Sequence, residues 1–513
     1  MKIKKLALIL IFIIVLNFSI ENGIKYTKST SFSFKKSSSE YNYLDLSIKA
    51  GNWLLNQTLY DPEGYKWPEY QNYTEKRNYT GMNSGLSGIG YFLLELYLQT
   101  RDNRYLIHAE NAANWLINNA IEENSGVKWE QLENTPNYFT GWFHGAAGIG
   151  YYFTELYYIT LNSTYLEFAN KAGNWLISEA IPEGSGCKWK WYQNNSFNYT
   201  GWDVGAAGIG HYFLRLYHFT SNVTYIQYAK SAAQWLINFA IPENGGYKWP
   251  YYENSIINST ELGSGTAGVG NFFLELFKST LNTTYLQYAE GAARWLISLA
   301  IPENGGYKFP IYQGTPSYYT GLSMGAAGIG LYLSNLYNQT MNGTYQKYSQ
   351  GVVQWLLSIA FSKNKTYWWP VFIGFNENFT GLERGAAGIG IFLIQMYNLF
   401  KNQTYYQYLN GTIEWLLSQA IPENGGLKWP RSENYSKFYT DWSWGGAGIG
   451  HFFLQLSTLY QPTFPIIDEK DNFPLFLSLL IGVVFLSAFL LIIFIRKRKK
   501  KRETVQNLNK KIQ

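Results

Sequence analysis

The 513-residue chain has one cysteine, Cys187, so an intrachain disulfide is excluded. Stability must then come from a buried core, which a domain of more than 400 residues can supply. Histidine is also scarce, with five in the whole chain, namely His108, His144, His211, His218 and His451. A zinc site of the usual kind needs several thiolates or imidazoles together. We therefore expect packed or capped histidines, with no metal and no cofactor.

Charged residues make up only 15% of the chain, and the net charge of +6 comes from its two ends. Lys2, Lys4 and Lys5 open the sequence, and residues 496–502 are consecutive lysines and arginines. Because each basic cluster adjoins an apolar run, this distribution indicates membrane topology. We expect no nucleic-acid partner.

Two apolar runs predict where the chain meets a membrane. Residues 6–20 carry no charge, so we interpret residues 1–23 as a signal peptide, or as an uncleaved signal anchor because no Ala-x-Ala site is visible. Residues 474–495 are also uncharged, and at ~1.5 Å per residue they could span the bilayer as one helix. The basic tail, residues 496–513, would then be cytoplasmic.

The remaining segments follow from this assignment. Residues 24–43 are rich in Ser and Thr and are expected to be a flexible lead-in, and residues 461–473 a linker. Residues 44–460 would lie outside the cell, anchored in the cell membrane by a single pass. Asn-x-Ser/Thr sequons fit an exterior location or arise from an Asn-, Ser- and Thr-rich composition, and they begin at Asn56, Asn72, Asn78, Asn162, Asn194, Asn198, Asn222, Asn258, Asn282, Asn338, Asn342, Asn364, Asn378, Asn402, Asn410 and Asn434.

Glycine is abundant, with 48 residues, and its spacing organises the chain. The stretch Gly-Ala-Ala-Gly-Ile-Gly or a close variant occurs seven times, and its first glycine recurs every 60 residues, at Gly85, Gly145, Gly205, Gly265, Gly325, Gly385 and Gly445. A fixed period of this length is typical of repeat proteins.

Each repeat predicts two helices. One follows the glycine stretch, as in residues 151–157, and the other has a broad apolar face, as in residues 284–300. Short links after the first helix favour antiparallel hairpins, and small residues place its start where helices crowd. We expect an all-α, closed (α/α)7 toroid of seven ~60-residue hairpins with these glycine-led helices inside. An open solenoid is the alternative, but no polar capping repeat is evident.

These repeats resemble the lanthionine synthetase C-like family, whose domain is a seven-hairpin α/α toroid. His144-Gly145-Ala146-Ala147-Gly148 is similar to the family's His-Gly-x-x-Gly motif. The resemblance implies a zinc site made by Trp-Cys-x-Gly and Cys-His-Gly, but this chain has Trp442-Ser443-Trp444-Gly445 and no Cys-His-Gly. We predict that the protein holds no zinc and is unaffected by a chelator.

The two residues before each leading glycine vary between repeats, as a site grafted on a repeated scaffold would. Nearby acids and one histidine are our candidate catalytic residues: Asp203, Glu261, Glu383, Asp441 and His144. The acids could instead stabilise helix N-termini. Helix axes spaced ~8 to 10 Å apart imply a ring ~20 Å across, so only Asp203 with Glu261, or Glu383 with Asp441, should reach the ~5 to 9.5 Å needed for glycoside hydrolysis. Arg384 is expected to pair with Asp441.

Aromatic residues are the candidate ligand-binding groups. Each long link carries one, namely Trp67, Trp129, Trp189, Trp249, Phe309, Trp369 and Trp429, and three more tryptophans, Trp142, Trp202 and Trp442, stand near the glycines. These rings could stack on sugars, together with Arg384 as a polar contact, or the link tryptophans could pin their own loops. A threonine five residues before each leading glycine is expected to cap the next helix.

Three functions stay open on these observations. The protein could bind or modify an extracellular peptide or glycan in a central funnel without zinc. It could be a carbohydrate-processing enzyme with a carboxylate pair, like the six-hairpin glycosidases. It could also be a non-catalytic surface scaffold.

Overall fold

A computed structural model of the chain describes residues 42–73 and 78–459. The chain divides into two units, residues 1–42 and residues 43–513, and the helices and strands named below all belong to the second unit. No helix within the described residues is long and apolar enough to cross a membrane. The predicted signal segment, lead-in, linker, span at 474–495 and basic tail lie outside the described residues, apart from the last residues of the lead-in.

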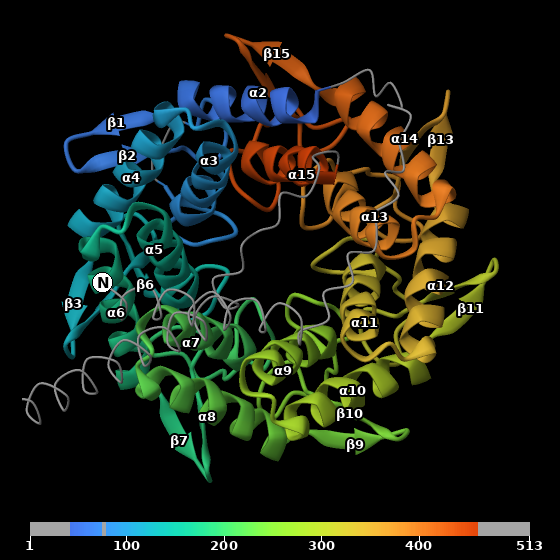
Figure 1. The fold of residues 1–513 in the computed structure, drawn as a ribbon, viewed down its shortest axis with the longest axis horizontal. Helices are drawn as coiled ribbons and strands as arrows, with labels where there is room; N and C mark the ends of the chain where they lie inside the picture. Colours follow the sequence, from blue (N-terminus) through green and yellow to red (C-terminus); the bar gives the residue numbers. More distant parts are fainter. Residues whose placement is uncertain (1–41, 74–77, 460–513) are drawn as a thin grey trace, which may run out of the picture. The chain divides into compact units, whose positions relative to one another are not determined.

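Helices form two concentric rings in this unit (Figure 1). The inner ring consists of α3 (Leu86–Thr100), α5 (Ala146–Thr160), α7 (Ala206–Thr220), α9 (Thr266–Thr280), α11 (Ala326–Thr340), α13 (Ala386–Phe400) and α15 (Gly446–Leu459). The outer ring consists of α2 (Tyr43–Asn56), α4 (Asn103–Asn118), α6 (Ser163–Ser178), α8 (Val223–Phe239), α10 (Thr283–Ser298), α12 (Gly343–Ile359) and α14 (Gln403–Gln419). The α/α toroid is thereby confirmed, with the glycine-led helices inside.

The first and last helices of the ring complete one hairpin together. Each inner helix packs on the outer helix that follows it in sequence, except α15, which packs on α2. The hydroxyl of Ser47 on α2 donates to the carbonyl of Gly450 on α15 at 2.9 Å, and α15 also contacts α3. The ring is therefore closed, and the open solenoid is excluded.

The glycine motif is explained by close packing between repeats. A Cβ on Gly90 would lie 2.2 Å from the hydroxyl of Tyr152 in the next repeat, and one on Gly88 would lie 1.9 Å from the carbonyl oxygen of Met82. The last contact of the series runs from Gly450 back to Phe92. Glycine is needed here because the inner helices pack their aromatic side chains against neighbouring backbone.

The long links contain β-hairpins, so the expectation of an all-α protein is wrong in this detail. One hairpin follows each outer helix, and an eighth stands in the second link; their strands are β1 (Leu59–Asp61), β2 (Gly64–Lys66), β3 (Ile121–Glu123), β4 (Gly126–Lys128), β5 (Glu130–Leu132), β6 (Thr135–Tyr138), β7 (Ile181–Glu183), β8 (Gly186–Lys188), β9 (Ile241–Glu243), β10 (Gly246–Lys248), β11 (Ile301–Glu303), β12 (Gly306–Lys308), β13 (Phe361–Lys363), β14 (Thr366–Trp368), β15 (Ile421–Glu423) and β16 (Gly426–Lys428).

Their turns have a sequence signature. Asn304 and Gly305 join β11 to β12 with φ of 51° and 78°, as a two-residue type I′ turn requires, and Ile301 pairs with Lys308. The hairpins that directly follow the outer helices project from the outer rim of the ring in Figure 1. They carry part of each long link away from the axis.

The threonines five residues before the leading glycines join repeats instead of capping helices. Thr320 donates its hydroxyl hydrogen to the carbonyl of Pro370 in the next repeat at 2.7 Å, and Thr440 closes the series on Pro68 at 2.7 Å. The inner helices begin at glycines without a side-chain cap. The capping expectation is wrong because the hydroxyl finds its partner across the repeat boundary.

Candidate functional site

A closed ring of backbone hydrogen bonds surrounds the axis of the toroid. The residue two before each leading glycine donates its N–H to the carbonyl of its counterpart in the next repeat, at 2.6 to 3.1 Å. The last of these bonds runs from Ser443 to Asn83 at 3.0 Å and closes the circle. Its seven members are Asn83, Phe143, Asp203, Gly263, Ser323, Glu383 and Ser443.

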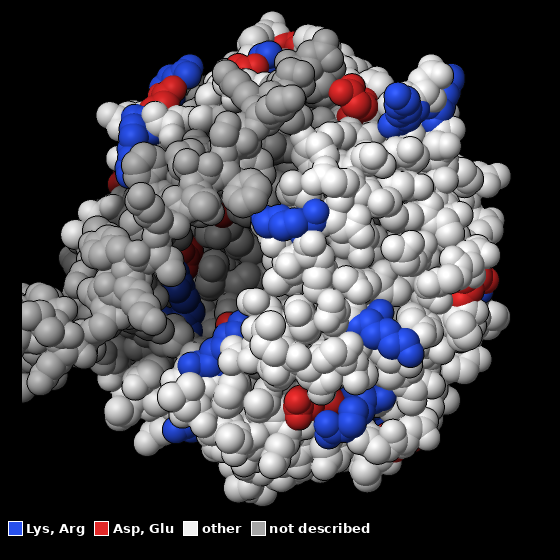
Figure 2. All heavy atoms as spheres, turned by 45° about the vertical axis from the view of Figure 1, so that its right-hand side comes forward, with Lys and Arg blue, Asp and Glu red and all other residues white. Residues whose placement is uncertain are grey.

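This ring brings side chains from distant repeats into one pocket of about 270 Å³. Six of its members line the pocket, with Phe143 the exception. Gly263 leaves the space open, because a Cβ there would lie 2.3 Å from Oγ of Ser323 and 2.4 Å from Oδ2 of Asp203. Figure 2 shows that the molecular surface is hollowed near the centre of the ring, with charged side chains in the wall.

The wall of the pocket is formed by the residues three before the leading glycines. On one side these are aromatic (Trp142, Trp202 and Trp442), and on the other they are leucines (Leu262, Leu322 and Leu382). The inner helices support the tryptophans: His211 lies 4.4 Å from Trp202 between ring centroids, and His451 lies 4.5 Å from Trp442. Asn271 of α9 completes the lining.

Two further carboxyl groups lie behind the ring. Five repeats have glycine at the position four before the leading glycine. There is little room for a side chain at this position, since a Cβ on Gly321 would meet Cα of Arg384 at 2.6 Å. The other two repeats have Glu261 and Asp441 at this position. Glu261 accepts from the backbone N–H of Ser264 at 2.9 Å. Asp441 accepts from the N–H of Trp444 at 2.7 Å. Both acids are buried.

The four acids are close enough to interact, and Asp203 with Glu261 is one of the neighbouring pairs expected to be within reach. A Cβ on Gly263 would lie 3.1 Å from Oε2 of Glu261 and 2.4 Å from Oδ2 of Asp203, so both oxygens are close to one point. The two oxygens therefore cannot be farther apart than the ~5.5 Å typical of retaining glycosidases.

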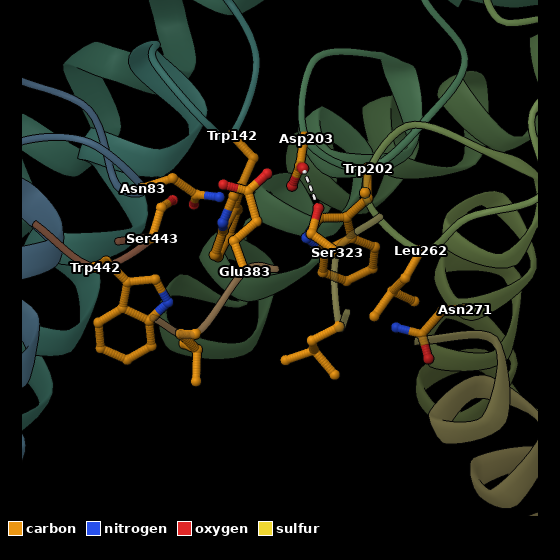
Figure 3. Close-up of a pocket in the computed structure, with 13 residues that line it drawn as sticks. Asn83, Trp142, Trp202, Asp203, Leu262, Asn271, Ser323, Glu383, Trp442 and Ser443 are labelled. Atoms are coloured by element: carbon orange, nitrogen blue, oxygen red, sulfur yellow. Dashed lines mark hydrogen bonds between the residues drawn. The ribbon is translucent and has the colours of Figure 1, made fainter. Parts of the chain in front are cut away.

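Asp203 and Glu383, three repeats apart, are also near one another, and the expectation that they face each other across too great a distance is wrong. In Figure 3 both carboxyl groups point into the same space. Neighbouring ring members are joined at the ~5 Å spacing of hydrogen-bonded backbones, not at the ~8 to 10 Å spacing of helix axes. The circle is correspondingly smaller.

Burial raises the pKa of every one of these carboxyl groups. It raises the pKa of Glu261 to about 7 and that of Asp441 to about 8, although backbone N–H donors act in the opposite direction. The pKa of Asp203 is raised well above its usual range by burial and then by repulsion from Glu383 and Glu261. Burial also raises the pKa of Glu383, against the attraction of Arg384. Asp203 and Asp441 therefore retain their protons near neutral pH.

Two buried polar atoms of the pocket lack partners among the described residues. Ser323 donates to Oδ2 of Asp203 at 3.1 Å, but neither Oε2 of Glu383 nor Oγ of Ser443 has a hydrogen bond of normal geometry there, although Ser443 and Ser323 lie near enough to Glu383 to lower its pKa. Glu383 is 7% exposed and Ser443 1%. Buried polar atoms are usually hydrogen-bonded, so these two are suited to a ligand.

The other predicted site residues lie elsewhere. His144 contacts Ser84 at 3.1 Å, and burial lowers its pKa to about 4, so it is neutral and outside the pocket lining. Arg384 lies 3.8 Å from Oε1 of Glu383, not beside Asp441, and its guanidinium sits over the ring of Trp444 at 5.1 Å.

The tryptophans of the long links are buried and do not face the pocket. Each donates its indole N–H to a leucine carbonyl of the preceding outer helix, as Trp249 does to Leu236 at 2.7 Å. The same arrangement, with an exposed fraction of 3% or less, holds for Trp67, Trp129, Trp189, Trp369 and Trp429. These placements favour the loop-anchoring alternative over sugar stacking.

Sequence reasoning did not select Asn83, Ser323 and Ser443 as site residues. The available signal was their place in the variable pair before the leading glycine, which they share with Asp203 and Glu383. No group of three or more potential metal ligands occurs among the described residues. Ser443, in the position of the family's first cysteine, supplies a hydroxyl instead of a thiolate.

Comparison with solved structures shows the same fold at low sequence identity. Nisin cyclase is 14% identical, with 74% of this chain and 89% of that chain covered and a TM-score of 0.52. A sugar epimerase from a ruminal bacterium is 12% identical, with 82% and 98% covered and a TM-score of 0.51.

The sequence comparisons give one family. No curated protein sequence matches the chain significantly. The model of the lanthionine synthetase C-like proteins matches residues 27–185 and 322–472, which is more than half of the chain and includes the first and last repeats of the ring. The chain therefore belongs to the lanthionine synthetase C-like family.

Proposed function

We propose that the axial pocket binds a carbohydrate unit and exchanges protons with it through the carboxyl cluster, without zinc. The observation that carries this proposal is the convergence of Asp203, Glu261 and Glu383 beside a tryptophan wall. Tryptophan faces suit the apolar face of a sugar ring, and carboxyl groups with pKa values near neutrality suit acid–base catalysis. The volume limits the bound part to a small unit.

Asp203 and Glu383 would have different roles. Asp203, which retains its proton and is held by Ser323, is placed to donate a proton to a leaving or ring oxygen. Glu383, which has a free oxygen in the pocket, is placed to accept one. Glu261, which lies behind the ring, is close enough to Asp203 to help raise its pKa and so keep its proton in place.

The test is to screen the purified full-length protein against a glycan array and a panel of aryl glycosides. Glu383→Gln should abolish turnover while preserving the fold, because the amide cannot accept a proton as the carboxylate does. Glu167→Gln, on the outer face of α6 and 59% exposed at its side chain, is the matched control and should change nothing. No binding and no turnover with any carbohydrate would rule the proposal out.

A peptide ligand is the second candidate, because the family model is named for lanthionine synthesis, a modification of peptides. The absence of the expected Cys and His residues from the matching turns argues against the zinc chemistry of that family. A peptide array probed in parallel with the glycans separates the two candidates. Binding to neither class would favour a scaffold.

We further propose that the toroid lies outside the cell, anchored through residues 474–495 with residues 496–513 inside. The uncharged run followed by seven basic residues supports this topology. Protease added to intact cells should degrade the toroid and spare a C-terminal tag. Protection of the toroid would contradict the proposal.

A further inference from the structure

The pocket combines an excess of buried acid with an aromatic wall, and this combination bears on which sugar it takes. Asp203 and Glu383 line the pocket, and Glu261 and Asp441 lie behind them. The cations acting on Glu383 are Arg384 and Arg431. Arg384 approaches Glu383 only to 3.8 Å and stacks on Trp444 outside the pocket lining. The negative charge of the cluster is therefore incompletely balanced by the protein.

Most of the charged groups that act on Asp203 and Asp441 are other acids. Asp203 faces Glu383 and Glu261, with Arg384 as the opposing charge. Asp441 faces Glu383 and also Glu69 from the long link of the first repeat. Burying like charges together is unfavourable unless they retain protons or a cation joins them.

Two polar atoms without hydrogen bonds indicate where such a cation would bind. Oε2 of Glu383 and Oγ of Ser443 line the pocket without hydrogen bonds among the described residues, and Asn83 lies beside them in Figure 3. An alkylammonium group offers three donors and no acceptor, so it can bond to a carboxylate and a hydroxyl oxygen together. The tryptophan wall adds the attraction of aromatic faces for a cation.

We propose that the ligand of this pocket carries a primary ammonium group and is an amino sugar, with the ammonium held between Glu383, Ser443 and the tryptophan wall. This inference rests on the proposed carbohydrate function and narrows it to one substrate class. Since a bound cation favours the ionised carboxylates, binding near neutral pH should release protons.

The experiment is calorimetric titration of the full-length protein with methyl glycosides of glucosamine, glucose and N-acetylglucosamine, and with lysine methyl ester as a free-amine probe. Glucosamine should bind about tenfold more tightly than either neutral sugar. Its binding heat should depend on the ionisation enthalpy of the buffer, as proton release requires. Glu383→Gln should remove the preference for glucosamine over glucose, and Glu167→Gln should retain it.

Each other outcome is decisive. Glucose binding as tightly as glucosamine would overturn the amino-sugar inference and leave the carbohydrate function standing. Lysine methyl ester binding as tightly as glucosamine would overturn the commitment to a sugar and indicate a peptide amine. No binding by any sugar would overturn both proposals. If Glu383→Gln does not fold, Ser443→Ala should weaken the preference for glucosamine, and an unchanged preference there would contradict the inference.

Discussion

At the scale of single residues, the same side chain type has opposite electrostatic roles in the ring and on its rim. Burial raises the pKa of Asp441 in the axial cluster. On the rim, Glu243 accepts from Lys248 at 2.8 Å, from Trp295 at 2.7 Å and from Gln313 at 2.8 Å, and these hydrogen bonds lower its pKa. The two acids should therefore change stability with pH in opposite directions.

Asp441→Asn should stabilise the protein at alkaline pH. The folded state retains a proton on Asp441 up to about pH 8, whereas the unfolded chain releases it near the ordinary aspartate pKa of 3.8, so wild-type stability falls as pH rises through this range. Asn keeps an acceptor for the Trp444 N–H. Thermal unfolding should show a gain on the order of 2 kcal/mol at pH 8 that disappears by pH 4. A gain independent of pH would contradict this explanation.

Glu243→Gln should show the reverse dependence. Its folded pKa is depressed, so its contribution is present above the unfolded pKa and is lost as pH falls through the folded value. We expect a loss on the order of 1 kcal/mol at pH 7, since the side chain is 31% exposed and its bonds are weakened by solvent. Denaturant titrations at pH 7 and pH 3 would measure it, and an equal loss at both would refute the assignment.

At the scale of elements, side chains that looked functional in the sequence stabilise loops and helix ends. Asn162, Asn222, Asn282, Asn342 and Asn402 are sequon residues, and each accepts from the backbone N–H two residues later as the N-cap of an outer helix. Helix capping thus accounts for the repetition of these five sequons, whether or not they carry glycans. The link tryptophans similarly fasten each loop to the preceding helix.

Trp249→Phe should destabilise the toroid without weakening ligand binding. It removes the bond from the indole N–H to Leu236 while keeping an aromatic ring, at a cost on the order of 1 kcal/mol. The fifth repeat is a natural precedent, because Phe309 occupies the equivalent position and is 2% exposed. Thermal unfolding and the glucosamine titration would be compared for wild type and variant. Loss of affinity at unchanged stability would restore the sugar-stacking alternative.

At the scale of the whole ring, closure depends on contacts between residues more than 350 positions apart. Trp53 of α2 donates its indole N–H to Glu423 of β15 at 3.1 Å. The equivalent bond between two consecutive repeats runs from Trp295 to Glu243 at 2.7 Å. The axial backbone ring and the threonine series close at the same place. The seventh hairpin is thus made from the first and last helices of the described unit.

Trp53→Ala should therefore cost as much as Trp295→Ala, on the order of 3 to 5 kcal/mol, although Trp53 lies at the beginning of the toroid. Both residues are fully buried. Denaturation followed by tryptophan fluorescence and circular dichroism should give one coincident transition in each variant. A small effect of Trp53→Ala, or separate transitions, would indicate that the ring unfolds as a linear array.

The sequence by itself determined the repeat, its two helices and their inner and outer places. These follow from local periodicity and from the size of Gly88 and Gly90, because the helices of each repeat pack mainly on those of neighbouring repeats. The hairpin turns were also present in the sequence, since Asn304-Gly305 is a type I′ signal.

Only the tertiary structure decided the site. The sequence places Asp203 and Glu383 180 positions apart, and helix spacing alone put them on opposite sides of a wide ring. The backbone bonds from Ser443 to Asn83 and around the circle draw these residues together, and no local pattern encodes a bond between the two ends of a toroid. The raised pKa values follow from that convergence, since burial and the repulsion between carboxyl groups exist only once the ring has closed.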